Sequence, residues 1–211
     1  MAAMSTTASS DRQARGRNRR GQGERLREDF VEAATRLLDE LGDDEALSMR
    51  AVARAVGSAA TSVYLHFADR DALVLAVLDR CHDELTRAVD DAEAASDDPV
   101  TRLRARTLVL GAWAHRHPGL YKVLHESALN ERAEMPFKRR LAERATAAVQ
   151  RCMDAGRAPA DDAATVALDL RAAVHGAVSM RLHQPGHPWP PLEEQVERFL
   201  VKLVGIRPPA P

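Results

Sequence analysis

Three observations predict an all-α fold of about nine helices for this chain. Apolar residues recur at spacings of three and four along most of the sequence, and strict two-residue alternation is almost absent. The chain has 211 residues, of which 45% are hydrophobic and only 4% aromatic, which is enough to bury a substantial core. The net charge is −1, so any affinity for a polyanion must come from a local basic patch.

Such a patch lies near the beginning of the chain. Residues 1–21 are rich in Ser, Arg and Gly without periodicity, and they are expected to form a disordered basic arm. Seven arginines and a single acid, Glu24, occur between Arg12 and Arg27. A first helix is expected from about Glu24 to Leu41, ended by Gly42 as a C-cap. Its apolar stripe consists of Leu26, Phe30, Ala33, Ala34, Leu37, Leu38 and Leu41.

The next segment predicts two short helices joined by a tight turn. Ser48 is a good N-cap for the second helix, which Gly57 ends. The third helix covers about Ala59 to Phe67, and a fourth runs from Asp69 to about Ala95. This layout is typical of a helix-turn-helix, whose second helix enters the major groove of DNA. A DNA-reading domain is therefore expected over residues 22–68, with the motif at about 48–67.

The third helix has an inner and an outer face. Val63 and Phe67 are four residues apart and are expected to anchor it inward. The outward set is Ala60, Thr61, Tyr64 and Leu65. Because it lacks Arg, Asn and Gln, Arg50 on the second helix is the stronger candidate for a guanine or a phosphate. Arg19 and Arg20 of the arm are candidates for a minor groove or the DNA backbone. Alternatively, Tyr64 and His66 are ordinary half-buried residues of an unrelated helical protein.

The remainder, residues 69–211, is expected to form a second helical domain. Its further helices are predicted at about Pro99–Arg116, Pro118–Leu124, Pro136–Ala155, Asp161–Leu182 and Leu192–Val204, with a proline-rich loop at 183–191.

No pattern in the chain predicts an enzyme, a metal site or a cofactor. Phosphate-binding glycine loops, nucleophile elbows, C-x-x-C and H-E-x-x-H are all missing. Eight histidines are present, but His115 and His117 point to different helix faces. Cys81 and Cys152 lie on apolar faces and are expected to be buried, reduced thiols, with redox or metal sensing left open. Without a signal peptide or a run of about 20 apolar residues, a cytoplasmic protein without membrane contact is expected.

Residues from about 24 to 75 resemble the N-terminal domain of TetR-family transcriptional regulators. The resemblance rests on Val63-Tyr64-Leu65-His66-Phe67 followed by Ala68-Asp69-Arg70-Asp71. Gly57-Ser58-Ala59 stands where the family usually has Gly-Val-Ser. The resemblance implies a homodimer, each subunit with a three-helix DNA reader and an α-helical effector and dimerisation domain. The residues taken as DNA contacts, from the motif and its outer surface, are Arg50, Ser48, Thr61, Ser62, Tyr64, His66, Arg70, Arg19 and Arg20.

A second resemblance lies in the C-terminal half. The segments His115–Tyr121 and Ala173–Met180 are similar to the helical domain of a TetR subgroup with a His-Gly motif. This implies a small, hydrophobic effector bound between helices. The expected ligand-binding residues are Trp113, Tyr121, Leu124, His125, Leu170, Val174 and Met180. The alternative is that these side chains simply form the core.

The last two helices are expected to form the dimer interface as a four-helix bundle. The candidates are the small residues Ala173, Gly176 and Ala177, and the apolar residues Val196, Phe199, Leu200 and Leu203. The same apolar face would otherwise pack within one subunit.

The function expected from these observations is a sequence-specific, DNA-binding transcriptional regulator. Its partners would be a double-stranded operator, a second copy of the chain and the effector. On family grounds it is a repressor released from a palindromic operator by the effector. The alternative is a helical metal-dependent or protein-binding module without DNA specificity.

Overall fold

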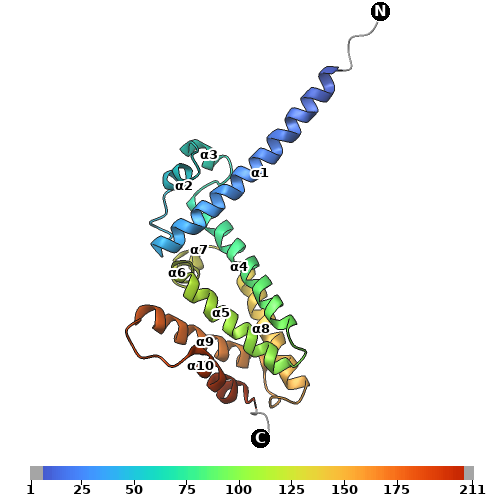
Figure 1. The fold of residues 1–211 in the computed structure, drawn as a ribbon, viewed down its shortest axis with the longest axis vertical. Helices are drawn as coiled ribbons and strands as arrows, with labels where there is room; N and C mark the ends of the chain where they lie inside the picture. Colours follow the sequence, from blue (N-terminus) through green and yellow to red (C-terminus); the bar gives the residue numbers. More distant parts are fainter. Residues whose placement is uncertain (1–6, 207–211) are drawn as a thin grey trace, which may run out of the picture. The chain divides into compact units, whose positions relative to one another are not determined.

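The computed structural model describes residues 7–206, and side chains from residue 22 onward (Figure 1). No strand occurs within residues 7–206. The helices are α1 (Thr7–Leu41), α2 (Met49–Ala55), α3 (Ala60–Tyr64), α4 (Arg70–Ala94), α5 (Pro99–Arg116), α6 (Pro118–Glu126), α7 (Leu129–Arg132), α8 (Pro136–Asp154), α9 (Ala163–His183) and α10 (Leu192–Phe199), followed by the π-helical turn η1 (Leu200–Val204). The all-α prediction is therefore confirmed.

The chain divides into two compact units, Met1–Val77 and Leu78–Pro211. The division falls inside α4, which runs without a break from the first unit into the second. The first turns of α4 therefore belong with the N-terminal helices, whereas the sequence-based boundary lay at residue 69.

The core of the N-terminal unit is formed where the apolar stripes of four helices meet. Phe30 and Leu38 of α1, Val52 of α2 and Val63 of α3 are each completely buried. Leu73, Val74 and Val77 of α4 are buried as well. The middle of the predicted α1 stripe is thus correct, but Leu41 at its end is 46% exposed.

The first helix is longer than the sequence predicts. It begins at Thr7 rather than near Glu24, so residues 7–21 are not the disordered arm that their composition indicated. Ala, Arg and Gln are good helix formers, and no proline interrupts this stretch, so the packed helix continues backward through it. Residues 1–6 lie outside the described part of the chain.

A left-handed glycine sets the turn between α2 and α3. Gly57 has φ +71°, a conformation that an L side chain rarely adopts. Ser58 N donates to Ala53 O at 2.9 Å, and Gly57 N donates to Arg54 O at 3.1 Å. This pair of bonds is a Schellman motif, which satisfies the last carbonyls of α2 and fixes the direction in which the chain leaves it.

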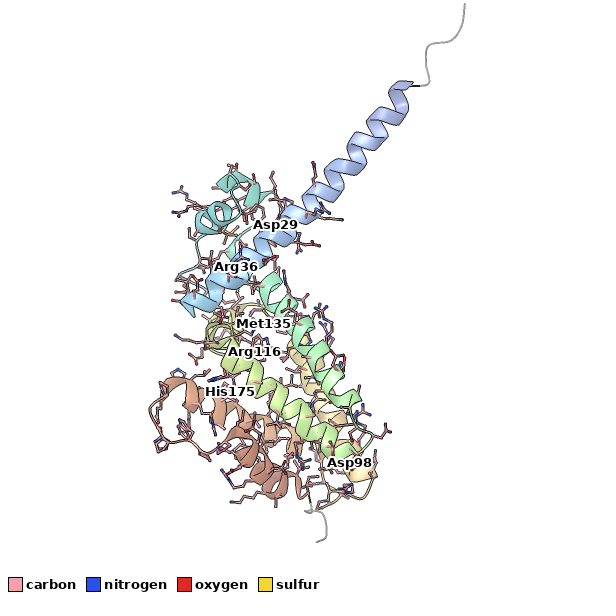
Figure 2. The ribbon with its side chains drawn as sticks, viewed as in Figure 1. Asp29, Arg36, Asp98, Arg116, Met135 and His175 are labelled. Atoms are coloured by element: carbon pink, nitrogen blue, oxygen red, sulfur yellow. The ribbon has the colours of Figure 1, made fainter. Side chains whose placement is uncertain are left out.

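The C-terminal unit is built around α5, α8 and α9, with α10 and η1 packed against them. Asp98 caps α5 by accepting a hydrogen bond from Thr101 N at 2.9 Å. Figure 2 labels Asp98 at the start of this helix and Arg116 at its end. Asp162 caps α9 in the same way, accepting from Ala164 N at 3.1 Å. These acids match the N-terminal preference for Asp and the positive end of the helix dipole.

Two features of this unit differ from the sequence-based expectation. The short helix α7 was not predicted, and Ser127 Oγ helps to start it by accepting from Leu129 N at 2.9 Å. The last helix changes from α to π geometry after Phe199 and ends at Gly205, whose φ is +73°. No helix in the described range combines the length and the low polarity needed to cross a bilayer.

Candidate functional site

The outer surface of the helix-turn-helix is held in place by two buried anchors. Val63 is completely buried and Phe67 is 3% exposed, as the sequence predicts. On the opposite side, Tyr64 is 56% and Leu65 is 83% exposed, and Thr61 is also exposed. The exposed Tyr64 at the end of the five-residue helix α3, and Leu65 directly after it, leave a protruding surface that can enter a groove. Ala60, which was expected to face outward, and Ser62, which was taken as a DNA contact, are half-buried.

The exposed side of α2 adds hydrogen-bond donors to this surface. Arg50 is exposed, as is Ser48, the N-cap residue, whose hydroxyl makes no capping hydrogen bond. Arg54 is exposed one turn after Arg50 and was missed by the sequence analysis. Its spacing of four residues from Arg50 was the available signal, because residues four apart share a helix face.

Two predicted DNA contacts make contacts inside the N-terminal unit instead. The His66 ring is half-buried, with its centroid 5.8 Å from that of Phe30. Arg70 Nη1 donates to the carbonyl of Glu45 at 3.1 Å, and its Nη2 lies 3.5 Å from Asp71. These contacts hold the loop before α2 and the end of the motif against the core. A phosphate contact by either side chain remains a prediction.

The arginines of the arm are not placed at side-chain level. The backbone of Arg19 and Arg20 is helical within α1, but their side chains lie outside the described residues. Their predicted contacts with DNA therefore stay predictions.

The C-terminal unit contains a cavity of about 430 Å³. It is enclosed by residues from α4, α5, α6, α8 and α9, and its volume is that of a small-molecule pocket. Six of the seven residues predicted to bind a ligand line it: Trp113, Tyr121, Leu124, His125, Leu170 and Val174.

Met180, the seventh predicted residue, does not line the cavity. It is 48% exposed, because six positions along a helix carry it round to a different face of α9 from Val174. The structure therefore gives no support to a contact between Met180 and a ligand in this cavity.

One end of the cavity is formed by three rings. Tyr121 Oη and His175 Nδ1 are hydrogen-bonded at 2.6 Å, and the His125 ring centroid lies 4.5 Å from each of the two other rings. Figure 2 labels His175, which lies on α9. Burial raises the pKa of Tyr121 to about 12, so the phenol keeps its proton.

The same surroundings keep His125 neutral. Burial, together with the neighbouring His175, Lys138 and Arg171, lowers the pKa of His125 to about 3. His125 is nevertheless exposed over more than a third of its surface, which weakens the effect of burial on its pKa, and it is one of the side chains that line the cavity. His125 thus offers the cavity an uncharged imidazole at neutral pH.

Several polar residues of the lining were missed by the sequence analysis. They are His82, Arg106, Thr107, Lys138, Arg171 and His175. The signal for two of them was a helical spacing, because Arg171 and His175 are four residues apart and therefore share a face of one helix. The others could not have been found, since they come from helices whose packing the sequence did not specify.

Arg106 is buried with its counterion. Its Nη1 lies 2.7 Å from Glu93 Oε1, and both side chains are nearly inaccessible to solvent. Arg102 and Arg151 approach the other oxygen of Glu93 at 3.6 and 3.5 Å. Arg106 thus has a buried counterion, which it shares with these two more exposed guanidinium groups.

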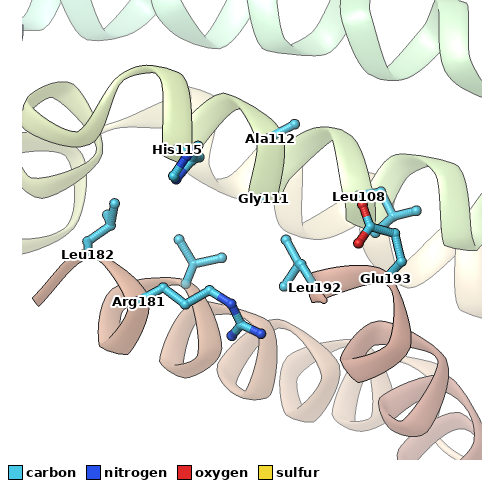
Figure 3. Close-up of a pocket in the computed structure, with 9 residues that line it drawn as sticks. Leu108, Gly111, Ala112, His115, Arg181, Leu182, Leu192 and Glu193 are labelled. Carbon is cyan, nitrogen blue, oxygen red and sulfur yellow. The ribbon is translucent and has the colours of Figure 1, made fainter. Parts of the chain in front are cut away.

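A second, smaller cavity of about 310 Å³ lies between α5, α9 and the start of α10 (Figure 3). Arg181 of this cavity donates to Ala177 O at 2.9 Å and to Pro190 O at 2.8 Å, which ties down the proline-rich loop. Leu192 lies so close to Gly111 that a Cβ there would be 2.4 Å from its Cδ2. None of the seven predicted ligand-binding residues lines this space.

The predicted dimer residues are only partly available to a second chain. Val196 is completely buried, and Leu200 and Ala177 are 1% and 5% exposed, inside the unit itself. For these three, the alternative of packing within one subunit is correct. Ala173, Gly176 and Phe199 are half-buried, and Leu203 is 37% exposed. Other large apolar side chains exposed on α9 and η1 are Leu168, Met180 and Val201.

Cys81 and Cys152 are both buried and are not joined in a disulfide. Burial raises the pKa of Cys152 to about 11, which disfavours the reactive thiolate of this residue. Among the described residues, no group of three or more His, Cys, Asp or Glu side chains has the arrangement of a metal site.

Comparison with protein families matches both units. Residues 30–77 match the model described as "Bacterial regulatory proteins, tetR family", and residues 103–203 match "Tetracyclin repressor-like, C-terminal domain". The subgroup with the His-Gly motif is not distinguished by these matches. No curated protein sequence gives a significant match.

Several solved structures share the fold. The fatty acid degradation regulator FadR from Bacillus halodurans is 12% identical, with a TM-score of 0.70, covering 84% of this chain and 94% of that one. RolR in complex with resorcinol is 17% identical, with a TM-score of 0.67, covering 89% and 91%. AibR in complex with isovaleryl coenzyme A and operator DNA is 19% identical, with a TM-score of 0.64, covering 86% and 99%.

The family matches together cover well over half of the chain, and they coincide with the helix-turn-helix and with the helical unit that contains the cavity. They assign the chain a regulatory rather than an enzymatic role. This protein belongs to the TetR family of DNA-binding transcriptional regulators.

Proposed function

We propose that the protein is a repressor that binds a palindromic operator as a homodimer and is released by a small, hydrophobic effector. The observation that carries the DNA-binding half is the exposure of Thr61, Tyr64 and Leu65 on a short helix whose other face is anchored by Val63 and Phe67. Hydroxyl groups and an apolar tip of this kind suit phosphates, base edges and thymine methyl groups.

Arginines on the neighbouring helix supply the charge that this surface lacks. Arg50 and Arg54 are both exposed on α2, and the chain as a whole has a net charge of −1. Attraction to the phosphate backbone must then be local, and it should weaken as salt increases, because each phosphate contact releases counterions.

The homodimer follows from family membership and from unpartnered apolar surface. Leu168 and Met180 on α9, and Val201 and Leu203 on η1, are the exposed large apolar side chains of the C-terminal unit. Covering them with a second copy would remove apolar area from water. Two readers about 34–36 Å apart would then meet successive major grooves of a palindrome.

The effector is proposed to bind the cavity of about 430 Å³ in the C-terminal unit. RolR was solved with resorcinol and AibR with isovaleryl coenzyme A, which supports a ligand-binding role for a domain of this fold. A ligand that binds one of two conformations more tightly shifts the population toward it. Because α4 belongs to both units, we propose that it carries this shift to the reader. As a bacterial regulator, the protein would act in the cytoplasm, where the DNA lies.

The experiment that tests DNA binding selects bound fragments from the host genome and measures their affinity by fluorescence anisotropy at several salt concentrations. Tyr64→Ala should lower the affinity for the selected palindrome about 5- to 100-fold, since one good contact in a groove is worth about 1–3 kcal/mol. Its stability should stay unchanged, because Tyr64 is 56% exposed.

Leu41→Ala is the matched control, because Leu41 is a comparably exposed apolar residue at the far end of α1. It should leave the affinity unchanged. Equal binding of the palindrome and of random DNA by the unaltered protein would contradict sequence-specific regulation and favour a module without DNA specificity. Equal affinity of Tyr64→Ala and the unaltered protein would contradict the assignment of the surface.

A further inference from the structure

The ring-lined end of the cavity carries positive charge without a matching carboxylate. Three permanently basic side chains line the cavity, Arg106, Lys138 and Arg171, and no Asp or Glu lines it. Arg106 is neutralised by Glu93 at 2.7 Å. The other two basic side chains, Lys138 and Arg171, lie near the ring-lined end, because both lower the pKa of His125.

Lys138 is held by neutral partners only. Its Nζ donates to the carbonyl of Leu124 at 2.6 Å and to Oδ1 of Asn130, and these contacts leave one of its three protons free. Burial lowers the pKa of Lys138, and the nearby Arg171 lowers it further. Among the side chains of residues 22–206, neither Lys138 nor Arg171 forms an ion pair with a carboxylate.

A nearby acid, Glu126, does not supply the missing charge. Glu126 raises the pKa of Tyr121, but it is exposed, does not line the cavity, and lies 3.9 Å from His183. Lys138 is half-buried without a counterion, and the more exposed Arg171 adds a second positive charge beside it, which disfavours the ammonium form of Lys138. A bound anion would offset this effect.

The same end of the cavity offers neutral hydrogen-bond donors. The hydroxyl of Tyr121 keeps its proton, because burial raises its pKa to about 12, and it is hydrogen-bonded to Nδ1 of His175 at 2.6 Å. The rest of the lining is largely apolar, with Leu141 and Ala145 of α8 and Leu170 and Val174 of α9. The cavity is therefore amphiphilic, with an apolar body and a cationic, donor-rich end.

We propose that the effector is an organic carboxylate with an apolar body, whose carboxylate binds between Lys138, Arg171 and the Tyr121–His175 pair. This inference rests on the proposed function, since it names the chemical class of the effector for that cavity. A cationic ligand would be repelled by both basic side chains. A neutral ligand would leave the ammonium without a counterion.

The test titrates the purified full-length protein with four eight-carbon probes that share one chain: octanoate, octan-1-ol, octylamine and octyl phosphate. Binding is measured by calorimetry and by the fluorescence of Trp113, which lines the cavity. Octanoate should bind at least about tenfold more tightly than octan-1-ol, because hydrogen bonds to charged groups are the stronger ones. Octylamine should not bind. Octyl phosphate binding more tightly than octanoate would overturn the carboxylate assignment.

Two variants locate the carboxylate. Lys138→Met and Arg171→Leu should each weaken octanoate binding about tenfold or more and leave octan-1-ol binding unchanged. Arg139→Leu is the control, because Arg139 is the next residue on α8 and its side chain is 78% exposed. Since Lys138 also joins α6 to α7 through its two acceptors, Arg171→Leu decides the question if Lys138→Met does not fold.

The outcomes separate this inference from the function on which it rests. If octanoate and octan-1-ol bind equally and both release the operator, the carboxylate site is wrong and the effector cavity stands. If no probe binds, and none releases the operator, the effector role of the cavity is contradicted as well. Equal octanoate affinity of Arg171→Leu and Arg139→Leu would overturn the placement of the carboxylate.

Discussion

The turn of the helix-turn-helix gives a sharp test of how the reader is held in shape. Gly57 has φ +71°, and a Cβ built on it would meet no atom within 4 Å. Replacing it by alanine therefore changes the backbone energy without a clash. A left-handed conformation costs an L residue about 1–2 kcal/mol. Alanine also restricts the unfolded chain, which offsets about 0.4–1 kcal/mol of that cost.

The net expectation for Gly57→Ala is a loss of about 0.5–1.5 kcal/mol in the free energy of unfolding of the N-terminal unit. Gly57→Asn should lose less, because asparagine tolerates the left-handed region better than alanine. The assay is urea unfolding, together with hydrogen exchange of the α2 and α3 amides, which reports on this unit alone. The amide of Ser58, bonded to Ala53 O at 2.9 Å, is the most direct probe.

Two results would refute this reasoning. If Gly57→Ala were as stable as the unaltered protein, the left-handed turn would not be required in solution. If Gly57→Asn were no better than Gly57→Ala, the loss would come from something other than backbone conformation. A general loss of stability in the C-terminal unit would also contradict the local origin of the effect.

Three further predictions test other parts of the molecule. Gly111→Ala should lower the stability of the C-terminal unit by about 1 kcal/mol or less in urea unfolding, because its Cβ would clash only with Cδ2 of Leu192, the flexible end of a half-buried side chain, and the helix preference of alanine offsets part of the cost; a loss of about 3 kcal/mol or more would mean that Leu192 cannot move aside. A Cβ at Gly176 in α9 would meet no atom within 4 Å, so Gly176→Ala should raise the stability of a single subunit by about 0.5–1 kcal/mol. If two copies of α9 approach closely at Gly176, the same change should weaken dimerisation as measured by sedimentation. Unchanged association would show that Gly176 is not part of the interface. His125→Gln should reduce acid sensitivity. The pKa of His125 is about 3 in the folded protein, whereas an unperturbed histidine has a pKa of 6.5. Between these two pH values the unfolded chain binds more protons than the folded protein, so the free energy of unfolding falls as the pH drops below 6.5. The free energy of unfolding should change by less than about 1.4 kcal/mol per pH unit, because His125 is partly exposed to solvent. The control is His187→Gln, at an exposed position of the proline-rich loop. If the two variants showed the same dependence of stability on pH, this prediction would be contradicted.

The sequence by itself determined the helical class and the anchors of the reader. Spacings of three and four place Phe30, Leu38 and Val63 on inward faces, and all three are completely buried. Gly57 marked the turn between the two motif helices, because a left-handed residue is needed there. These properties depend on near neighbours along the chain, so the local pattern suffices to predict them.

Only the tertiary structure decided which side of each C-terminal helix faces a partner, a cavity or solvent. Val196 and Leu200 fit an interface by pattern but lie in the core of their own unit, whereas Met180 points out of the cavity. Lys138 and Arg171 are 33 positions apart in the sequence, and their meeting at one end of the cavity depends on the packing of α8 against α9. A stripe of apolar residues indicates that one face of a helix is covered, but contacts between distant segments decide which segment covers it.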